Sequence, residues 1–243
     1  MKRWLDGFGM AWGMFLAIPC PLRRWNEDAR EQMLVWMVGM GLIVGGVWVG
    51  ALFLLKNAPI PLRALVLTAV PWLMTGFLHL DGYMDVCDAA LSRRELSVRQ
   101  KILKDSHCGA FAVICMVLLA LTQWSLFCSS GGGHWSGLLC IPAVSRACAA
   151  LAVRALRPMG SSQYAAMKEK SAAVTVVLAV LTALGIGLPA ALGGSFAPLA
   201  TAAGYWLAVW YADRQLGGMS GDVSGFALTL GELAGVAVRT LWR

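Results

Sequence analysis

The feature that most limits how this chain can fold is a set of long segments without a single charged residue. Residues 33–55 form one such segment of 23 residues, and residues 108–128 form another of 21. A helix needs about 20 apolar residues to cross the hydrocarbon core of a bilayer. Residues 171–211 contain 41 uncharged residues, enough for two crossings with a turn near Pro189 and Gly193. These segments predict a protein that crosses a membrane several times.

Composition excludes the other classes of protein. Hydrophobic residues make up 58% of the 243 residues and charged residues only 14%, against about 25% charged residues in ordinary soluble domains. The apolar content excludes a disordered chain, and the grouping of apolar residues into blocks argues against a β-barrel, in which they alternate. We therefore expect an all-α, polytopic helical bundle in the membrane. The net charge of +7 indicates membrane topology rather than a nucleic-acid partner.

Three further apolar segments bring the expected number of membrane segments to about seven: residues 64–80, 135–153 and 223–238. Residues 4–18 follow a basic N-terminus, but Asp6 and three glycines interrupt them. We interpret this stretch as a retained interfacial or re-entrant helix rather than a signal peptide. The whole chain, residues 1–243, then forms one membrane-embedded domain.

The basic residues give the expected orientation. With the N-terminus in the cytoplasm, fifteen of the twenty Lys and Arg residues fall in cytoplasmic segments and four outside. This split fits the positive-inside rule. Residues 81–107 then face the cytoplasm.

An acidic motif ends one of the apolar segments. On a helix with 100° per residue, Asp81, Asp85 and Asp88 lie within an arc of about 60°. Carboxylates clustered in this way are costly beside a membrane segment, and hard oxygen ligands suit Mg²⁺ or Mn²⁺ that bridges to phosphate groups. The alternative is a solvated helix end that favours negative charge. We prefer the metal site, because the alternative accounts for only one or two of the acids.

A basic segment follows the acidic motif and contains Arg93, Arg94, Arg99, Lys101 and Lys104. Alone, such a loop marks topology or a contact with anionic lipid. Beside an acidic metal cluster, it completes a clamp for phosphate. Arg146 lies within an apolar segment and needs an internal partner. That partner is either a substrate phosphate or a nearby acid, and both interpretations stay open.

A second acidic region lies near the C-terminus, where Asp222 stands among Gly217, Gly218, Gly221 and Gly225. Small residues allow close approach of a ligand or of another helix. We expect Asp222 and Glu232 to form a second half-site that faces the first across the bundle. The two residues are ten apart, about 80° off a common helix face. One of them then serves the metal or a substrate hydroxyl, and the other pairs with Arg146.

Four motifs, taken in order, resemble those of the bacterial cobalamin synthases, the adenosylcobinamide-GDP ribazoletransferases. They are His79-Leu-Asp81-Gly82-x-x-Asp85-x-x-Asp88, Lys104-Asp105-Ser106-x-x-Gly109, Ala143-Val-Ser145-Arg146, and Gly217-Gly218-x-x-Gly221-Asp222-x-x-Gly225 followed by Glu232. The resemblance covers nearly the whole chain. The chain departs from the family pattern in having Leu16-Ala17 in place of Thr-Arg, Ala89 in place of Gly, and His107 in place of Arg.

The resemblance implies a Mg²⁺-dependent transferase that joins α-ribazole, or its 5′-phosphate, to adenosylcobinamide-GDP and releases GMP. It implies catalytic roles for Asp81, Asp85, Asp88 and Glu232, and metal binding by Asp81, Asp85, Asp88 and Asp222. It implies substrate binding by His79, Gly82, Lys104, Asp105, Ser106, Arg146 and Gly221. It also implies a multi-pass protein of the bacterial cytoplasmic membrane, in contact with lipid and with its active site facing the cytoplasm; an oligomer stays open.

Two other functions remain as alternatives. A CDP-alcohol phosphotransferase of lipid synthesis also carries an Asp-Gly-rich motif in a membrane helix, but its usual Ala-Arg is missing after Asp81-Gly82. A cation transporter would use Asp81, Asp85 and Asp88 as a site in the middle of the membrane. A transporter would have no need of the basic segment beside its acids.

Overall fold

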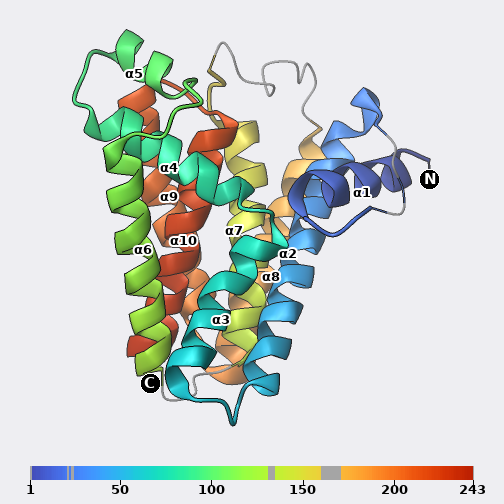
Figure 1. Cartoon of the computed structure of the whole chain (residues 1–243). Helices are drawn as coiled ribbons and strands as arrows, with labels where there is room; N and C mark the ends of the chain where they lie inside the picture. The colour runs from blue at the N-terminus through green and yellow to red at the C-terminus, as the bar shows by residue number, and fades with distance from the viewer. Residues whose placement is uncertain (1, 21, 23–24, 131–134, 160–170, 243) are drawn as a thin grey trace.

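The computed structural model describes residues 2–20, 22, 25–130, 135–159 and 171–242. These residues form helices and no β-strand, and the helices assemble into one bundle (Figure 1). The helices are, in chain order, α1 (Lys2–Phe15), the 3-10 helix η1 (Glu27–Ala29), α2 (Arg30–Leu54), α3 (Ile60–Met74), α4 (Leu78–Leu91), α5 (Leu96–Ile102), α6 (Ala110–Ser129), α7 (Trp135–Ala155), α8 (Ala172–Gly193), α9 (Ala197–Leu216) and α10 (Gly221–Leu241). The predicted all-α membrane fold is confirmed.

The number of membrane segments differs from the prediction of about seven. In the described part of the chain, α2, α6, α7, α8 and α10 are each long and apolar enough to cross a membrane. The helices α3 and α4 add a sixth span if they are counted together. The helix α9 also has sufficient length, but it contains two Trp and two Tyr residues and carries Asp213 and Arg214 near its C-terminal end. It is not among the helices that are both long and apolar enough to cross a membrane.

The segment expected to cross at residues 64–80 is bent by 92° between α3 and α4. Gly76 and Phe77 have positive φ angles of 58° and 64°, which glycine adopts freely and Phe77 adopts at a cost. Thr75 Oγ1 donates to the carbonyl of Pro71 at 3.0 Å just before the bend. As a result, α4 runs across the end of the bundle at which α1 and α5 lie (Figure 1). The three aspartates of α4 therefore lie at that end.

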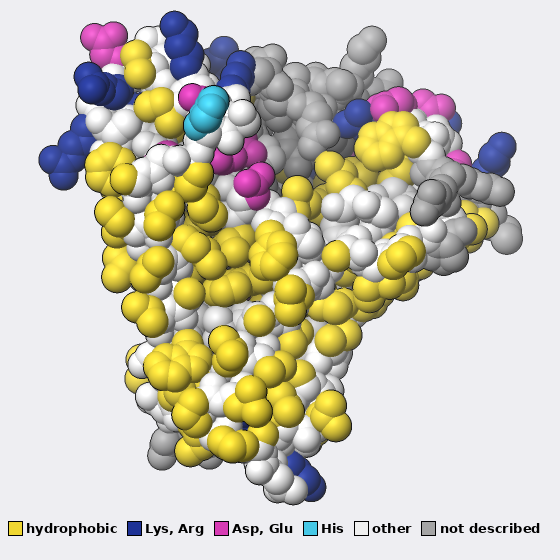
Figure 2. Space-filling model, viewed as in Figure 1, with side chains coloured by type: hydrophobic (Ala, Val, Ile, Leu, Met, Phe, Trp, Pro, Cys, Tyr) yellow, Lys and Arg dark blue, Asp and Glu magenta, His cyan; other side chains and the backbone are white. Residues whose placement is uncertain are grey.

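The helix α7 forms the centre of the bundle. It contacts α2, α8, α9 and α10, and every residue from Ile141 to Ala150 is buried. A side chain at Gly41 or Gly45 of α2 would meet the backbone of α7, so these glycines allow the close packing that membrane helices use. In contrast, α6 and α8 expose many apolar side chains, and Figure 2 shows a broad hydrophobic surface on the face of the bundle that it draws.

The predicted N-terminal helix is present as α1, which packs against α2 at the same end as α4 and α5. It buries Met10 and Phe15 and exposes Trp4 and Leu5. The ring of Phe15 stacks on that of His79 with their centroids 6.2 Å apart. This contact joins α1 to the first turn of α4.

Candidate active site

Four aspartates from two helices form an acidic cluster at one end of the bundle. Asp81 is exposed, whereas Asp85, Asp88 and Asp222 are half-buried. The negative charges of the other three all act on Asp85, and the charge of Asp81 also acts on Asp222. Figure 2 shows acidic side chains at this end of the molecule, where most of the visible basic side chains also lie. Because like charges at close range repel one another, this cluster favours binding of a cation.

Two glycines bring α4 and α10 into contact. A Cβ atom at Gly82 would lie 2.8 Å from the Cα of Asp222, and one at Gly225 would lie 3.0 Å from the carbonyl oxygen of His79. The two helices therefore touch backbone to backbone beside the acidic cluster. The expected approach of Asp222 to the acidic motif is thus observed.

The glycine-rich stretch before α10 forms a turn and a helix start. Gly217 has a φ angle of 76°, and Met219 then makes backbone hydrogen bonds with Arg157 at 2.8 Å and with Met159 at 2.9 Å. Ser220 Oγ accepts from the N–H of Val223 at 3.2 Å and so caps α10. This cap holds Asp222 in the first turn of α10, where it faces α4.

Replacing Gly82 with alanine is expected to push α4 away from α10. Forcing a methyl group into such a contact typically costs about 1–3 kcal/mol, so the thermal unfolding midpoint of the protein in detergent should fall. Gly50→Ala is a matched control, because a Cβ at Gly50 meets nothing within 4 Å. Equal midpoints for the two variants would contradict the backbone contact between α4 and α10.

Asp88 accepts two backbone hydrogen bonds from the start of α6. Its Oδ2 accepts from the N–H of Gly109 at 2.6 Å, and its Oδ1 accepts from the N–H of Ala112 at 2.9 Å. Sequence reasoning did not find this contact, because 21 residues separate Asp88 from Gly109 and no periodic pattern relates them. The glycine at position 109, in the second motif, was the one feature of the sequence that could have indicated this contact.

The loop between α5 and α6 carries the exposed residues Lys104, Asp105, Ser106 and His107. Asp105 Oδ1 accepts from the backbone N–H of His107 at 3.1 Å and lies 2.6 Å from His107 Nδ1. This hydrogen bond raises the pKa of His107 above its ordinary value and lowers the pKa of Asp105. A cavity of about 330 Å³ is lined by Asp88 together with Asp105 and His107, so the loop and the acidic helix share one opening.

The basic segment before this loop is anchored to α9. Arg99 hydrogen-bonds to the side chain of Gln215, and Gln100 Nε2 donates to the carbonyl of Leu216 at 2.8 Å. Four other basic residues of the segment, Arg93, Arg94, Lys101 and Lys104, are exposed. The acidic cluster therefore has a basic surface beside it, as the sequence predicted.

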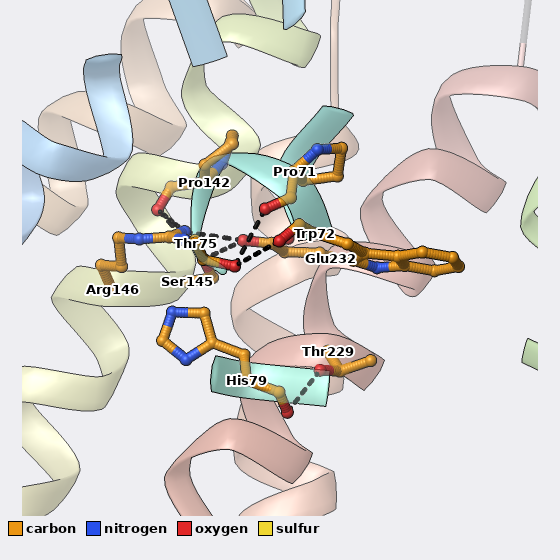
Figure 3. A network of polar contacts seen from close by, with 9 residues as sticks. All are labelled: Pro71, Trp72, Thr75, His79, Pro142, Ser145, Arg146, Thr229 and Glu232. Atoms are coloured by element: carbon orange, nitrogen blue, oxygen red, sulfur yellow. Dashed lines mark hydrogen bonds and ion pairs between the residues drawn. The ribbon is translucent and has the colours of Figure 1, made fainter. Parts of the chain in front are cut away.

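Arg146 and Glu232 form an ion pair inside the bundle (Figure 3). Arg146 Nη1 donates to Glu232 Oε1 at 2.8 Å, and Ser145 Oγ donates to the same oxygen at 2.9 Å. Arg146 is 1% exposed and Glu232 is 8% exposed, so the pair is shielded from water. Of the two partners left open for Arg146, the structure has the acid.

His79 also lies in the interior rather than at the surface of the site. Figure 3 shows its ring near Ser145 and Arg146, and its carbonyl accepts from Thr229 Oγ1 at 3.3 Å. The predicted site residues thus fall into two groups. An outer group contains Asp81, Asp85, Asp88, Lys104, Asp105, Ser106, Gly221 and Asp222, and a buried group contains His79, Arg146 and Glu232, with Gly82 at the contact between α4 and α10.

Arg154 is a further buried polar residue that sequence reasoning missed. It donates to Glu31 Oε1 at 2.7 Å, to Thr175 Oγ1 at 2.9 Å and to the carbonyl of Ser171 at 2.7 Å. These bonds join α7 to α2 and α8. The sequence offered one sign of this contact: Arg154 lies at the end of one apolar segment and Glu31 at the start of another.

The fold and the site define a polytopic helical membrane protein with a carboxylate-rich polar site at one end of its bundle. The chain belongs to the cobalamin-5-phosphate synthase family, whose family model matches residues 7–240. This membership confirms the resemblance noted in the motifs. It does not favour a CDP-alcohol phosphotransferase or a cation transporter.

Named relatives agree with the family. The chain is 35% identical over 245 residues to an adenosylcobinamide-GDP ribazoletransferase of Clostridium perfringens (strain 13 / Type A), with 97% of this chain and 98% of the relative covered. It is 32% identical over 254 residues to an adenosylcobinamide-GDP ribazoletransferase of Geobacillus kaustophilus (strain HTA426), with 96% and 94% covered. No solved structure is significantly similar to the chain.

Proposed function

We propose that this chain is an adenosylcobinamide-GDP ribazoletransferase of cobalamin synthesis. In the reaction, a hydroxyl of α-ribazole, or of its 5′-phosphate, attacks the phosphorus attached to cobinamide. A new P–O bond forms, the P–O bond to the guanosine phosphate breaks, the hydroxyl proton is lost and GMP leaves. The observation that carries the proposal is the convergence of Asp81, Asp85 and Asp222 beside a basic loop, in a chain whose relatives bear this name. Such transfers need positioning and charge neutralisation above all.

We further propose Mg²⁺ as the cofactor, held by Asp81, Asp85 and Asp222. Mg²⁺ is usually bound by one or two carboxylates together with waters and substrate phosphates, rather than by a complete cage of protein ligands. Among the described residues, no group of three or more His, Cys, Asp or Glu side chains is placed so that it could hold a metal ion by itself. The carboxylates of the cluster repel one another. They fit a cation whose remaining coordination positions are filled by oxygens of the substrate. When bound, the ion would supply neutralisation of pyrophosphate charge.

The residues of the chain itself would bind and orient the substrates. Lys104 and His107 would contact the phosphate groups from the loop, since both are exposed beside the cavity shared with the acidic helix. Ser106 is exposed in the same loop and would donate to a phosphate oxygen. The buried pair of Arg146 and Glu232 would keep α7 and α10 in register below the site.

The site is proposed to face the cytoplasm of a bacterium, in the cytoplasmic membrane. The start of α1, the segment around α5 and the C-terminal end of α7 lie at the end of the bundle at which the acidic cluster lies. These segments carry Lys2, the basic residues around α5, and Arg154. Basic residues collect on the cytoplasmic side of membrane proteins. The exposed apolar surface of α6 and α8 would then contact the lipid.

The direct test is an assay of the purified protein in detergent with adenosylcobinamide-GDP and either α-ribazole or α-ribazole 5′-phosphate. The expected result is release of GMP in step with a corrinoid product whose mass includes the added nucleoside. Omission of the α-ribazole acceptor should stop GMP release. Release of CMP from a CDP-alcohol, with no turnover of the corrinoid, would overturn the proposal.

The pH dependence of substrate binding should follow His107. The hydrogen bond and charge of Asp105 raise the pKa of His107 above 6.5. The positive charge is therefore complete at lower pH and lost as pH rises through this raised pKa. We expect the KM for adenosylcobinamide-GDP to rise severalfold between about pH 6 and about pH 9. His107→Arg, which keeps its charge, should abolish that rise. If the KM of this variant depended on pH as that of the original protein does, His107 would be excluded as a phosphate contact.

A further inference from the structure

We propose that Asp88 is a positioning residue that holds the start of α6, and with it the loop of residues 104–108, and that it is not a metal ligand. The proposal rests on the proposed function only in taking the substrate phosphates as the groups that this loop contacts. It separates the three aspartates of the acidic motif into two roles. Asp81 and Asp85 face the substrate, and Asp88 fixes the loop beside them.

The start of α6 has no cap within its own sequence. Its N-cap residue is Gly109, which has no side chain, and the first N–H groups of any helix need acceptors from elsewhere. Asp88 accepts from the N–H groups of Gly109 and Ala112, which are the N-cap and N3 positions. These are the two donors that a capping box satisfies with two side chains of one helix. Here one carboxylate from α4 satisfies both.

The lack of a side chain at Gly109 makes room for this carboxylate. A Cβ atom at Gly109 would lie 2.5 Å from Oδ1 of Asp88 and 2.8 Å from its Cγ. No side chain larger than hydrogen fits without moving Asp88 or α6. The two residues therefore act as one unit, and a change at either residue should break the same contact.

The surroundings of the aspartates differ in a way that supports separate roles. Asp88 lies at the positive end of the α6 dipole and uses both oxygens in hydrogen bonds to backbone. In the described part of the chain, the carboxylates of Asp81 and Asp85 have no hydrogen bond or ion pair, only repulsion from other acids. Asp88 thus has a partner in the protein already, whereas the other two need a cation.

The position of Asp88 affects the substrate loop directly. Asp88 lines the same cavity as Asp105, His107 and Gly109, and only five residues separate Leu103 from Gly109. Leu103 is buried and fixes one end of the loop; the hydrogen bonds of Asp88 fix the other. Loss of the second attachment should loosen the loop without a direct effect on the metal.

The test compares Asp88→Ala, Asp88→Asn, Gly109→Ala and the double variant of Asp88→Ala with Gly109→Ala. The first readout is limited trypsin cleavage after the exposed Lys104 in the folded, detergent-solubilised protein, with cleavage after Arg94 as an internal reference. Loss of a helix cap should speed cleavage after Lys104 about fivefold. Asp88→Asn, which keeps one acceptor, should show an intermediate rate. The double variant should be no faster than either single variant, because both break one contact.

The second readout separates positioning from metal binding. We expect Asp88→Ala and Gly109→Ala to raise the KM for adenosylcobinamide-GDP severalfold and to leave the Mg²⁺ concentration for half-maximal rate unchanged. Gly50→Ala should change neither quantity. An Asp88→Asn variant with normal cleavage after Lys104 and a raised Mg²⁺ requirement would overturn the proposal in favour of a metal ligand. The cleavage measurement does not require turnover, so failure of the proposed function leaves the capping test decisive.

Discussion

Replacing Asp85 with asparagine is expected to abolish measurable turnover of adenosylcobinamide-GDP while the protein stays folded in the membrane. Three other aspartates act on this carboxylate, so it occupies the electrostatic centre of the cluster. Its loss removes a ligand for a hard cation and relieves repulsion at the same time. We expect a fall in kcat of about a thousandfold or more, equivalent to about 4 kcal/mol. GMP release at saturating Mg²⁺ measures the effect.

The matched control for this prediction is Asp28→Asn, because Asp28 is an exposed aspartate outside the cluster. Its turnover should equal that of the original protein. Both variants should unfold at a temperature no lower than the original protein does, which separates a chemical effect from a folding effect. If an Asp85→Asn variant kept normal turnover at limiting Mg²⁺, the acidic cluster would have no part in the mechanism.

The second large effect is expected from Glu232→Ala. This change leaves the guanidinium of Arg146, only 1% exposed, without its ionic partner. Removing one partner of a buried ion pair typically costs about 3–5 kcal/mol. The variant should unfold at a much lower temperature in detergent or fail to accumulate in the membrane. Thermal unfolding followed by circular dichroism measures the loss.

Two companion variants test the cause of that loss. Glu232→Gln keeps an oxygen that accepts from Arg146 and Ser145, so its loss of stability should be smaller. Replacing Arg146 with Met and Glu232 with Leu together removes both charges, and such exchanges are often neutral or stabilising. If the double variant were as unstable as Glu232→Ala, the unpaired charge would not be the cause.

The fold class was predictable because the bilayer imposes it. Segments such as residues 33–55 contain no charge and are long enough to span, and helices are then the simplest way to satisfy their backbone. The bend between α3 and α4 was not predictable from hydropathy, since the apolar residues continue through it. It depends on positive φ angles at Gly76 and Phe77, and a phenylalanine gives no signal of such a conformation.

The candidate site was predictable in its members more than in their roles. The spacing of Asp81, Asp85 and Asp88 places them on one face of a helix. Asp222 is far from them in the sequence, so its approach to these three residues was only an expectation. Arg146 was predicted to need an internal partner, with Asp222 or Glu232 as the candidate acid, and the structure pairs it with Glu232. The contact of Asp88 with Gly109 depends on how α4 lies against α6, which only tertiary structure determines.

The right-angled bend between α3 and α4 gives the helix of the three aspartates a direction different from that of the helix before it. Spanning helices tilt when the acyl chains around them lengthen or shorten, and residues carried on a tilting helix move with it. At 92° to α3, α4 lies across the end of the bundle, and the close backbone contacts at Gly82 and Gly225 fasten it to α10. The aspartates of α4 therefore keep their place relative to α10, and the bend at Gly76 and Phe77 lies between them and α3.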